Sequence, residues 1–525
     1  MTPSPRTPPR LWAGAVLAVV LLQAVLRFPG RPRDMGIGTF LLLPIELPII
    51  LLALLILRAW WLRAAVVTGA TGVLILRIAD IGTFQAFSRP FNPALDLHLL
   101  VSGWDLLSSS IGRAQALALI AAAVLAVGAV AAALWWALSA LVRLRGVARR
   151  AAVAVSALLL VAGLAGLAVP RAPVTADLIP ETARRLGRMT DAVRDLRAFA
   201  AELPQDDVGQ PGFAALRGRD VIVVFVESYG RSFVEDAPFA PAAQDRLRAV
   251  EARLAEAGWH ARSGWLTAAS RGGQSWLNHG TFLSGLWVDG QARYDRLMTS
   301  ERRSLNRLFG QAGWRTGAVM PAITLDWPEA AWFGYDVTLD AAGLGYRGQP
   351  FEWVTMPDQY TLTALDDRLR GTERVMVEAA LITSHAPWTP LPRILPWEEI
   401  GDGSVFDGSH RDGDTPREVW ADPDRIRTQY ALALDYSLEV IGQWVARQPE
   451  DALIVVLGDH QPAQLLTGPD ATADVPIHVM SRDAALLDRL PDNIFGPGMI
   501  PSPDRPAQRM DAMRAVFATE FEDAG

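Results

Sequence analysis

The stretch VIVVFVES at residues 221–228 decides the fold of the larger part of the chain. Six consecutive apolar residues, most of them β-branched, lead directly into the polar pair Glu227-Ser228. A strand that is buried on both faces has this continuous apolar pattern, whereas a strand with one face in solvent alternates. Strands of this kind occur in parallel sheets whose two faces are covered by helices. The stretch therefore predicts a central strand of an α/β domain.

Similar strand patterns recur further along the chain, with helical patterns between them. The other buried-strand runs are RVMVEAALIT (374–383), ALIVVLGD (452–459) and VPIHVM (475–480). Apolar residues at helical spacing lie at 241–257, 301–312, 358–370 and 424–447. Strands that alternate with helices predict an α/β domain with a mostly parallel sheet, over residues 216–525. The segment 394–424 is expected to be a long surface loop.

The first 170 residues have a different composition. Half of the 525 residues are hydrophobic and only 20% are charged, and long apolar runs are concentrated in this part. The runs lie near 11–27, 37–58, 62–86, 112–142 and 148–170. A helix needs about 20 apolar residues to cross the hydrocarbon core of a bilayer, and these runs reach or approach that length. They predict a five-span α-helical membrane domain over residues 1–170, whose first span is an anchor and not a cleaved signal.

The distribution of arginine predicts how these spans are oriented. The connector RLRGVARR (143–150) is strongly basic and is expected on the cytoplasmic side, which places everything after residue 170 outside. Arg27, Arg31 and Arg33 would then lie outside, although the loops of membrane proteins that are rich in arginine are usually cytoplasmic. Arg77 and Asp80 are one helical turn apart and are expected to pair with each other inside the bilayer.

Two connecting segments complete the first half of the chain. Residues 88–111 are expected to lie at the membrane interface. Residues 171–215 are expected to form a juxtamembrane linker, with a helix at 181–201.

Composition also excludes several classes of function. The net charge of −7 argues against a nucleic-acid partner, because such a partner requires a basic surface. The absence of cysteine excludes disulfides, thiolate zinc sites and a cysteine nucleophile.

Polar residues follow three of the predicted strands. Glu227 follows the first, Asp459-His460 ends the third, and Ser384-His385 ends the second. Taken alone, a carboxylate after a strand is usually a cap or a surface charge, and a single histidine is usually structural. The carboxyl ends of parallel strands meet at one edge of a sheet, however. Two carboxylates and imidazole at one edge predict a divalent-metal site.

The segment SRGGQSWLNHGTFLSG (270–285) contains a glycine-rich turn before a predicted helix. The backbone amides of such a turn and the helix N-terminus can bind an anion. Ser275 would be an ordinary N-cap of this helix, or, beside a metal, a nucleophile.

Three further residues, two histidines and an arginine, have predicted roles that are structural or supporting. His279 lies one turn after Ser275 and either packs or faces the site. His478 is expected to be a buried structural histidine. Arg231 is expected to pair with or orient Glu227.

The ordered motifs ESYGRS, the glycine-rich turn with a hydroxyl, TSHAPW and GDHQP resemble those of the alkaline phosphatase/sulfatase superfamily. The resemblance is greatest to the membrane-anchored lipoteichoic acid synthases and phosphoglycerol transferases. It implies an extracytoplasmic sulfatase-like catalytic domain in which Glu227, Ser275, Asp459 and His460 bind the metal. It also implies that Ser275 is the nucleophile and that His385 lies near the transferred phosphate.

The sequence departs from this family where the phosphoglycerol group is gripped. Trp327 matches the family's tryptophan before Gly334-Tyr335-Asp336, but the matching histidine and arginine are missing. Arg271 or Arg347 would have to supply the positive charge. Ser275 is not followed by the Pro-x-Arg sequence from which sulfatases make formylglycine, and this disfavours sulfate-ester hydrolysis.

The resemblance therefore implies transfer of a phospholipid headgroup, phosphoglycerol first, through a phosphorylated Ser275. One divalent ion is expected: manganese, magnesium or zinc. The donor would be an anionic phospholipid and the acceptor a glycan or glycerolipid hydroxyl. The protein would be a multi-pass protein of the bacterial inner membrane with a periplasmic catalytic domain. Two alternatives stay open: a membrane-bound phosphodiesterase or phosphatase that uses water, and a non-catalytic transporter or scaffold.

Overall fold

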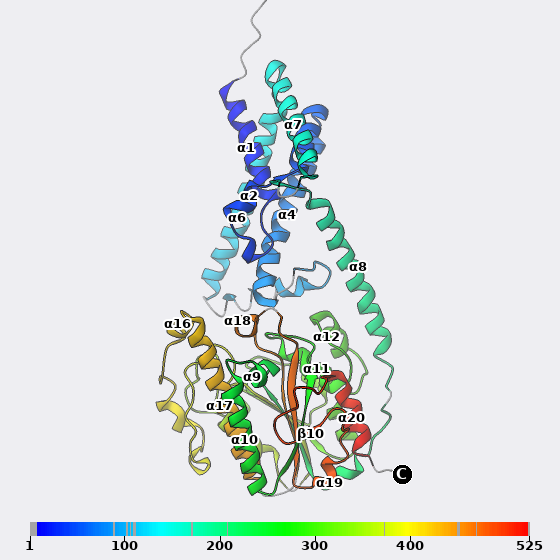
Figure 1. The fold of residues 1–525 in the computed structure, drawn as a ribbon, viewed down its shortest axis with the longest axis vertical. Helices are drawn as coiled ribbons and strands as arrows, with labels where there is room; N and C mark the ends of the chain where they lie inside the picture. The colour runs from blue at the N-terminus through cyan, green and yellow to red at the C-terminus, as the bar shows by residue number, and fades with distance from the viewer. Residues whose placement is uncertain are drawn as a thin grey trace, which may run out of the picture. The chain divides into compact units, whose positions relative to one another are not determined.

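The chain forms two compact units, residues 1–195 and 196–525, and each is described by itself. In Figure 1 the first unit runs from dark blue to blue-green. The computed structural model describes residues 8–87, 90–100, 103–104, 107–108, 112–169, 172–206, 208–371, 373–448, 452–468 and 470–522.

The first unit is a bundle of apolar helices together with the beginning of the polar helix α8. Its principal helices are α1 (Pro9–Leu26), α3 (Glu46–Leu57), α4 (Trp60–Phe87), α6 (Arg113–Val142), α7 (Gly146–Gly166) and α8 (Leu178–Glu202), the last of which continues into the second unit. Helix α1 packs against α6, and α3 packs against α7. A Cβ atom on Gly14 would lie only 2.4 Å from Ala140 Cβ, so small residues allow α1 and α6 to approach closely.

Four helices of the described residues are long and apolar enough to cross a membrane: α1, α4, α6 and α7. The predicted second span, 37–58, is not one helix. It divides into α2 (Ile37–Leu41), the two-residue strand β1 (Leu43–Pro44) and the 12-residue helix α3. Pro44 cannot donate a backbone hydrogen bond within a helix, which favours a break at this point. The count of five spans therefore stays a prediction.

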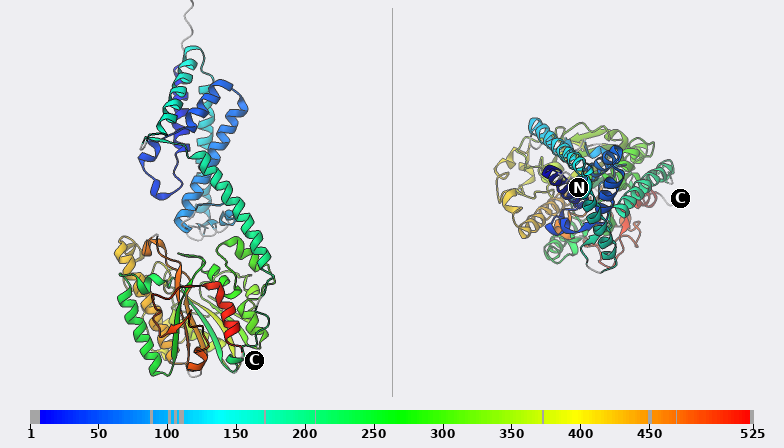
Figure 2. Two further views of the ribbon diagram at one scale, coloured as in Figure 1. Left: turned by 45° about the vertical axis from the view of Figure 1, so that its right-hand side comes forward. Right: turned by 90° about the horizontal axis from the view of Figure 1, so that it is seen from above.

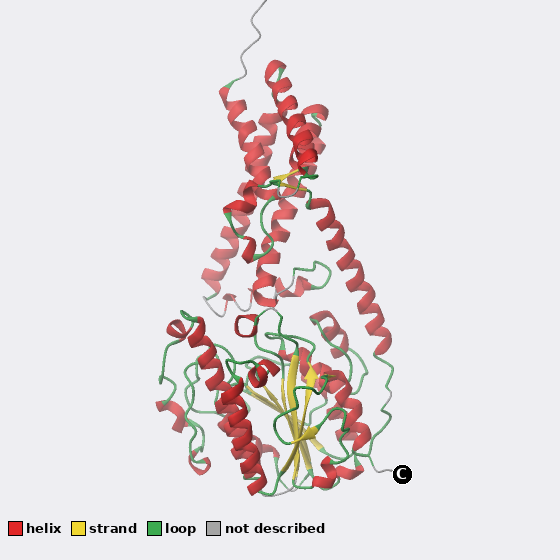
Figure 3. Cartoon of the chain, in the orientation of Figure 1, coloured by secondary structure: helices red, strands yellow, loops and turns green. Residues whose placement is uncertain are grey.

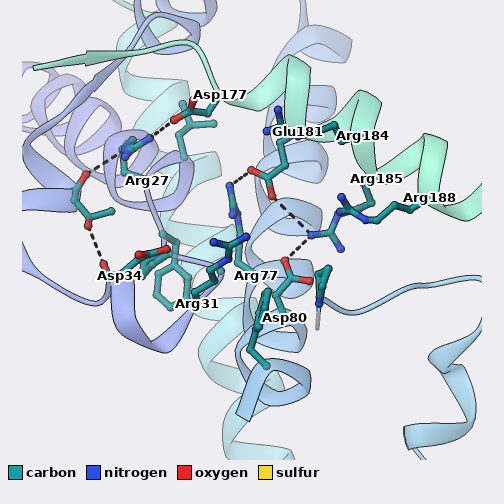
Figure 4. A pocket seen from close by; sticks show the side chains of 17 residues that line it. Arg27, Arg31, Asp34, Arg77, Asp80, Asp177, Glu181, Arg184, Arg185 and Arg188 are labelled. Atoms are coloured by element: carbon teal, nitrogen blue, oxygen red, sulfur yellow. Dashed lines mark hydrogen bonds and ion pairs between the residues drawn. The ribbon is translucent and has the colours of Figure 1, made fainter. Parts of the chain in front are cut away.

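The predicted pairing of Arg77 with Asp80 is wrong. Arg77 on α4 pairs with Glu181 on α8, and Asp80 pairs with Arg185, also on α8 (Figure 4). The two α8 residues are themselves one turn apart. Helix α8 thus offers two opposite charges about one turn apart, as α4 does, and the ion pairs form between the two helices instead of within one helix. This arrangement supports the predicted helix at 181–201, which extends over Leu178–Glu202.

The second unit is built on one mixed sheet. Within the described residues its strand order is β10-β4-β9-β8-β3-β7-β5-β6, and β11 pairs with β4. The bounds are β3 (Asp220–Val226), β4 (His260–Thr267), β5 (Arg315–Met320), β6 (Val337–Asp340), β7 (Val375–Leu381), β8 (Ala452–Gly458), β9 (Asp474–Ser481), β10 (Gly496–Pro497) and β11 (Gln508–Arg509). Strands β8, β3, β7, β5 and β6 are parallel. The predicted α/β fold is confirmed.

Alternate residues of β3 face two hydrophobic cores. Ile222 and Val224 belong to the core that includes α10 (Ala240–Glu256), α15 (Asp358–Leu369) and α17 (Pro423–Ala446). Val223 and Phe225 belong to the core that includes α11 (Ser275–Ser284), α13 (Leu305–Gln311) and α20 (Met513–Glu520). Figure 3 shows the yellow sheet between these two groups of helices, and Figure 2 shows the same unit in further views. Burial on both faces explains why the strand is apolar throughout.

Strand β9 is buried as predicted, but it runs antiparallel to both of its neighbours, β8 and β4. A strand buried on both faces has the same apolar pattern in either direction. Within its described residues, the connection from β8 to β9 contains one helix, the four-residue α18 (Gln464–Thr467), and no longer helix of the kind that usually forms a parallel crossover.

The predicted helices of this unit agree with α10, α13, α15 and α17. The predicted loop 394–424 is mostly irregular and contains η4 (Trp397–Glu399), η5 (Ser404–Gly408) and α16 (Pro416–Val419). The predicted interfacial segment 88–111 is described at 90–100, 103–104 and 107–108, where it includes η2 (Asp96–His98), and its place at the membrane interface stays a prediction. Strands β4, β5 and β6 were not predicted, because HARSGWLT and RTGAVM contain polar residues and a glycine, and VTLD has only four residues, two of them polar.

Candidate active site

The site lies at the carboxyl edge of two adjacent parallel strands. Val226, the last residue of β3, is in register with Gly458, the last residue of β8. Each strand continues into polar residues, Glu227 after β3 and Asp459-His460 after β8. Because parallel strands in register end at the same level, these side chains are brought together.

The backbone at this edge holds an unusual geometry. Ser228 has a φ of 57°, in the left-handed region, and its amide donates to Asp459 Oδ1 at 2.8 Å. A Cβ atom on Gly458 would lie 1.8 Å from the carbonyl oxygen of Tyr229, so only glycine fits there. The hydroxyl of Tyr430 donates to the Ser228 carbonyl at 2.9 Å. These contacts fix the segments that carry Glu227 and Asp459.

Glu227, Asp459 and His460 form one buried cluster. One side-chain ligand atom of each lies within 4.8 Å of the others. His460 Nε2 is 3.4 Å from Glu227 Oε1 and 3.7 Å from Asp459 Oδ2. It is buried and has no hydrogen-bond partner, although its other ring nitrogen, Nδ1, lies 2.9 Å from the carbonyl of Gln461.

The pKa values in this cluster are shifted because two carboxylates and an imidazole are buried close together. Burial and the charge of Glu227 raise the pKa of Asp459 to about 7. Burial alone would raise the pKa of Glu227, but His460 and His385 hold it below its ordinary value. Burial would lower the pKa of His460, but Asp459 and Glu227 raise it. A cation between these groups would relieve the repulsion between the carboxylates.

Ser275 is the first residue of α11, and its Oγ donates to Glu227 Oε2 at 3.2 Å. The residue that precedes the helix is Gln274, so the N-cap interpretation of Ser275 is wrong. Gly272, Gly273 and Gln274 all have positive φ, which turns the chain sharply before the helix. Asn278 holds this turn by accepting from the amides of Ala269 and Ser270.

The four side chains fit a divalent cation. They supply two carboxylates, an imidazole nitrogen with no other partner and a hydroxyl. Oxygen ligands suit magnesium and manganese, while imidazole also suits zinc. The donor set is therefore compatible with any of the three expected metals.

A cavity of about 340 Å³ opens beside this cluster, and its lining includes Glu227, Ser275 and Asp459. His385 also lines it and stacks on Trp353, with ring centroids 3.7 Å apart. The Nδ1 of His385 lies 2.6 Å from the carbonyl of Ala386, so Nδ1 carries the proton and Nε2 is left for a ligand. Trp327 lines the same cavity.

The predicted substrate-binding role of Arg271 is not supported. Its side chain donates to the carbonyl of Ala471, and it is not among the residues that line the cavity. Arg347 does not line the cavity either, and the described lining contains no arginine. The backbone of Arg271 forms a β-bridge with Gln461, the residue after His460, and this bridge holds Arg271 where it is. Arg231 pairs with Glu235 and Asp474 and not with Glu227.

A buried acidic network behind the cavity was not predicted. Glu378 lies in the middle of β7 and is completely buried. It is bonded to His279 Nδ1 at 2.6 Å, to Asn306 at 3.3 Å and to the hydroxyl of Tyr335. His279 also stacks on Phe225 and lines the cavity, so it both packs and faces the site. The signal in the sequence was a carboxylate inside an apolar strand, which requires partners.

His478 is buried, as expected. It lies between the hydroxyls of Tyr229, at 3.0 Å, and Ser263, at 2.8 Å.

Comparison with known proteins finds no matching family model and no matching curated protein. Among solved structures, the chain is similar to the lipoteichoic acid synthase LtaP from Listeria monocytogenes, with 12% identity, a TM-score of 0.39, and 63% of this chain and 78% of that chain covered. It is similar to the Streptococcus pyogenes phosphoglycerol transferase GacH in complex with sn-glycerol-1-phosphate, with 11% identity, a TM-score of 0.37, and 63% and 81% covered.

A third similar structure is the C-terminal periplasmic domain of the phosphoethanolamine transferase EptC from Campylobacter jejuni, with 10% identity, a TM-score of 0.37, and 58% and 89% covered. At these scores the likeness assigns no substrate to this chain.

Proposed function

We propose that the protein is a divalent-metal-dependent membrane enzyme that transfers a phospholipid headgroup through a covalent intermediate on Ser275. The observation that carries this proposal is the contact of Ser275 Oγ with Glu227, inside the cluster completed by Asp459 and His460. A hydroxyl at a helix N-terminus and beside a metal-binding set has the surroundings of an activated nucleophile.

Ser275 would lose its hydroxyl proton to solvent and attack the phosphorus of the donor phosphodiester, and diacylglycerol would leave. A divalent ion held by Glu227, Asp459 and His460 would supply Lewis acidity, lowering the pKa of the hydroxyl and neutralising charge on the phosphoryl oxygens. Glu227 accepts the hydrogen bond of the serine and so orients its oxygen toward the cavity. The phosphoryl oxygens would face the backbone amides at the start of α11.

His385 is placed to act on the departing oxygen. Its Nδ1 is fixed by the Ala386 carbonyl, and its ring is fixed by stacking on Trp353. In the protonated form, Nε2 would donate to the oxygen of diacylglycerol as it leaves. In the second step the neutral ring would accept a proton from the attacking hydroxyl of the acceptor.

The lining of the cavity favours a headgroup without an acidic group of its own. Its described lining contains no arginine, but it contains Trp276, Trp327 and Trp353. Indole rings and the imidazole of His279 suit the carbon chain and hydroxyls of glycerol. Phosphatidylglycerol is therefore the first candidate donor, and a glycan or glycerolipid hydroxyl is the candidate acceptor. The apolar helices of the first unit would keep the enzyme at its lipid substrate, in the bacterial inner membrane with a periplasmic active site.

A transfer assay tests this proposal. Full-length protein is incubated with phosphatidylglycerol labelled in its headgroup glycerol, an acceptor glycolipid and a divalent cation. We expect the label on the acceptor, and no reaction with Asp459→Asn. Release of the label only as free glycerol phosphate would instead support the phosphodiesterase alternative. Absence of both reactions and of bound metal would support a non-catalytic protein.

A further inference from the structure

A second cavity, of about 540 Å³, lies within the first unit and is lined by an unusual number of charges. It is formed by the segment after α1, the end of α4 and the beginning of α8 (Figure 4). Its lining includes six arginines and four carboxylates: Arg27, Arg31, Arg77, Arg184, Arg185, Arg188, Asp34, Asp80, Asp177 and Glu181. Positive charge is therefore in excess in this cavity.

Three of the arginines are used to hold the helices together. Arg77 and Arg185 form the crossed pairs between α4 and α8, and Arg27 pairs with Asp177 at 3.0 Å. These three side chains are half-buried and form ion pairs with three of the four carboxylates. They explain the packing of α8 against the bundle without any contribution from the other arginines.

The other three arginines have no carboxylate partner among the described residues. Arg184 and Arg188 are exposed and one turn apart on α8. Arg31 is exposed, and its guanidinium lies 5.2 Å from the centre of the Phe84 ring. All three line the same cavity. Guanidinium groups that line one cavity without a protein carboxylate partner are suited to bind a phosphate, because each can donate two parallel hydrogen bonds.

The cavity is at the end of two candidate membrane spans. The first span ends at Leu26, immediately before Arg27–Arg31, and the second ends at Phe84. Span ends lie at the level of lipid headgroups. The cavity lining also contains Phe28 and Phe84, which offer apolar surface beside the arginines. Charge and apolar surface thus occur together at the depth of a phospholipid phosphate.

We propose that this cavity is a phosphate-binding site in the membrane unit, occupied by the headgroup phosphate of an anionic phospholipid and gripped by Arg31, Arg184 and Arg188. The same chemistry would also admit a soluble phosphate ester, and the experiment separates these two sources. The site would hold lipid independently of the catalytic cluster, so this proposal does not depend on the proposed function.

Binding is measured on full-length protein by native mass spectrometry during titration with phosphatidylglycerol, with phosphatidylcholine, and with free glycerol phosphate. The test variant is Arg184→Gln/Arg188→Gln. Its matched control is Arg194→Gln/Arg197→Gln, which removes the same charge from the same helix at exposed positions that do not line the cavity. All proteins carry Ser275→Ala, so that bound lipid is not turned over and binding at the catalytic site is equal.

We expect the test variant to bind one molecule of phosphatidylglycerol with an affinity lower by about tenfold or more, because it lacks charged hydrogen bonds to the phosphate. The control should be close to the parent protein, and phosphatidylcholine binding should be unchanged throughout. Arg31→Gln provides a second variant from another element, should the α8 variant unfold.

Arginine-dependent binding of glycerol phosphate but not of lipid would support a phosphate site and assign it to a soluble ligand. Equal loss of lipid in the test and control variants, or no loss of any ligand in either, would overturn the proposal.

Discussion

Ser275 is the nucleophile of the proposed reaction. Its hydroxyl is not used to cap α11, and it is directed instead to Glu227. We predict that Ser275→Ala lowers kcat by at least about a thousandfold, as removal of a nucleophile does in other enzymes. Bound metal, measured by elemental analysis, should persist because Glu227, Asp459 and His460 remain. Turnover close to that of the parent protein would exclude Ser275 as the nucleophile.

Glu378 is expected to contribute more to stability than any exposed carboxylate. Its removal leaves His279, Asn306 and Tyr335 without their buried partner. We predict that Glu378→Ala lowers the free energy of unfolding by about 3 kcal/mol, from the cost of unsatisfied buried polar groups. Denaturant unfolding measures this change. Glu256→Ala, at an exposed position of α10, is the control, and an equal effect of the two changes would contradict the role assigned to Glu378.

His478 gives the second unit a defined dependence on pH. Burial lowers the pKa of His478 from 6.5 to about 3. Between pH 6.5 and about 3 the unfolded chain binds a proton at this histidine that the folded chain does not. The free energy of unfolding is therefore not reduced by His478 above pH 6.5, and it falls as the pH decreases below that value. The loss from this group is about 1.4 kcal/mol per pH unit. Unfolding measured from pH 7 to 4 should show a shallower slope in His478→Gln. An unchanged slope in that variant, or an equal change in His260→Gln at an exposed position, would contradict this origin.

At the scale of the elements, the β8 terminus depends on one glycine. A side chain at Gly458 would collide with the carbonyl oxygen of Tyr229, which is backbone and cannot rotate away. We predict that Gly458→Ala displaces Asp459 and His460 and weakens divalent-metal binding by about tenfold or more, as changes around metal ligands do. Metal titration measures this effect. Gly371→Ala, where a Cβ atom meets nothing within 4 Å, should bind metal normally.

Elements could be predicted from the sequence where one local pattern determined them. The buried strands β3, β7 and β8 have continuous apolar runs, and α10, α15 and α17 have helical periodicity. The positions of Glu227 and Asp459-His460 at strand ends also indicated that they would meet at one edge, and the resemblance added Ser275 to them. Each of these features depends on a few neighbouring residues.

Features that depend on contacts between distant segments could not be predicted in this way. The direction of β9 depends on how it pairs with β8 and β4, and the partners of Arg77 and Asp80 lie about a hundred residues away on α8. Arg271 was assigned to substrate by its position in a motif, but its side chain binds a carbonyl 200 residues further along the chain. Charged side chains are long, and their partners are chosen by tertiary structure.

At the scale of the whole chain, apolar helices and an α/β unit occur together in one polypeptide. Each unit has its own charged cavity, and the two cavities have opposite character. The cavity of the second unit has carboxylates and imidazoles without arginine, which suits a cation and a phosphoryl group together. The cavity of the first unit has an excess of arginine, which suits an anion alone.

The central claim is that Ser275 becomes covalently loaded in a reaction that requires the Glu227, Asp459 and His460 cluster. The most direct measurement is the intact mass of full-length protein, followed by peptide mapping, after rapid acid quenching of its reaction with phosphatidylglycerol and a divalent cation. We predict the added mass of one glycerophosphoryl group on Ser275, absent after chelation of the metal and absent in Asp459→Asn. An adduct on another residue, or headgroup turnover by the Ser275→Ala variant, would contradict the claim.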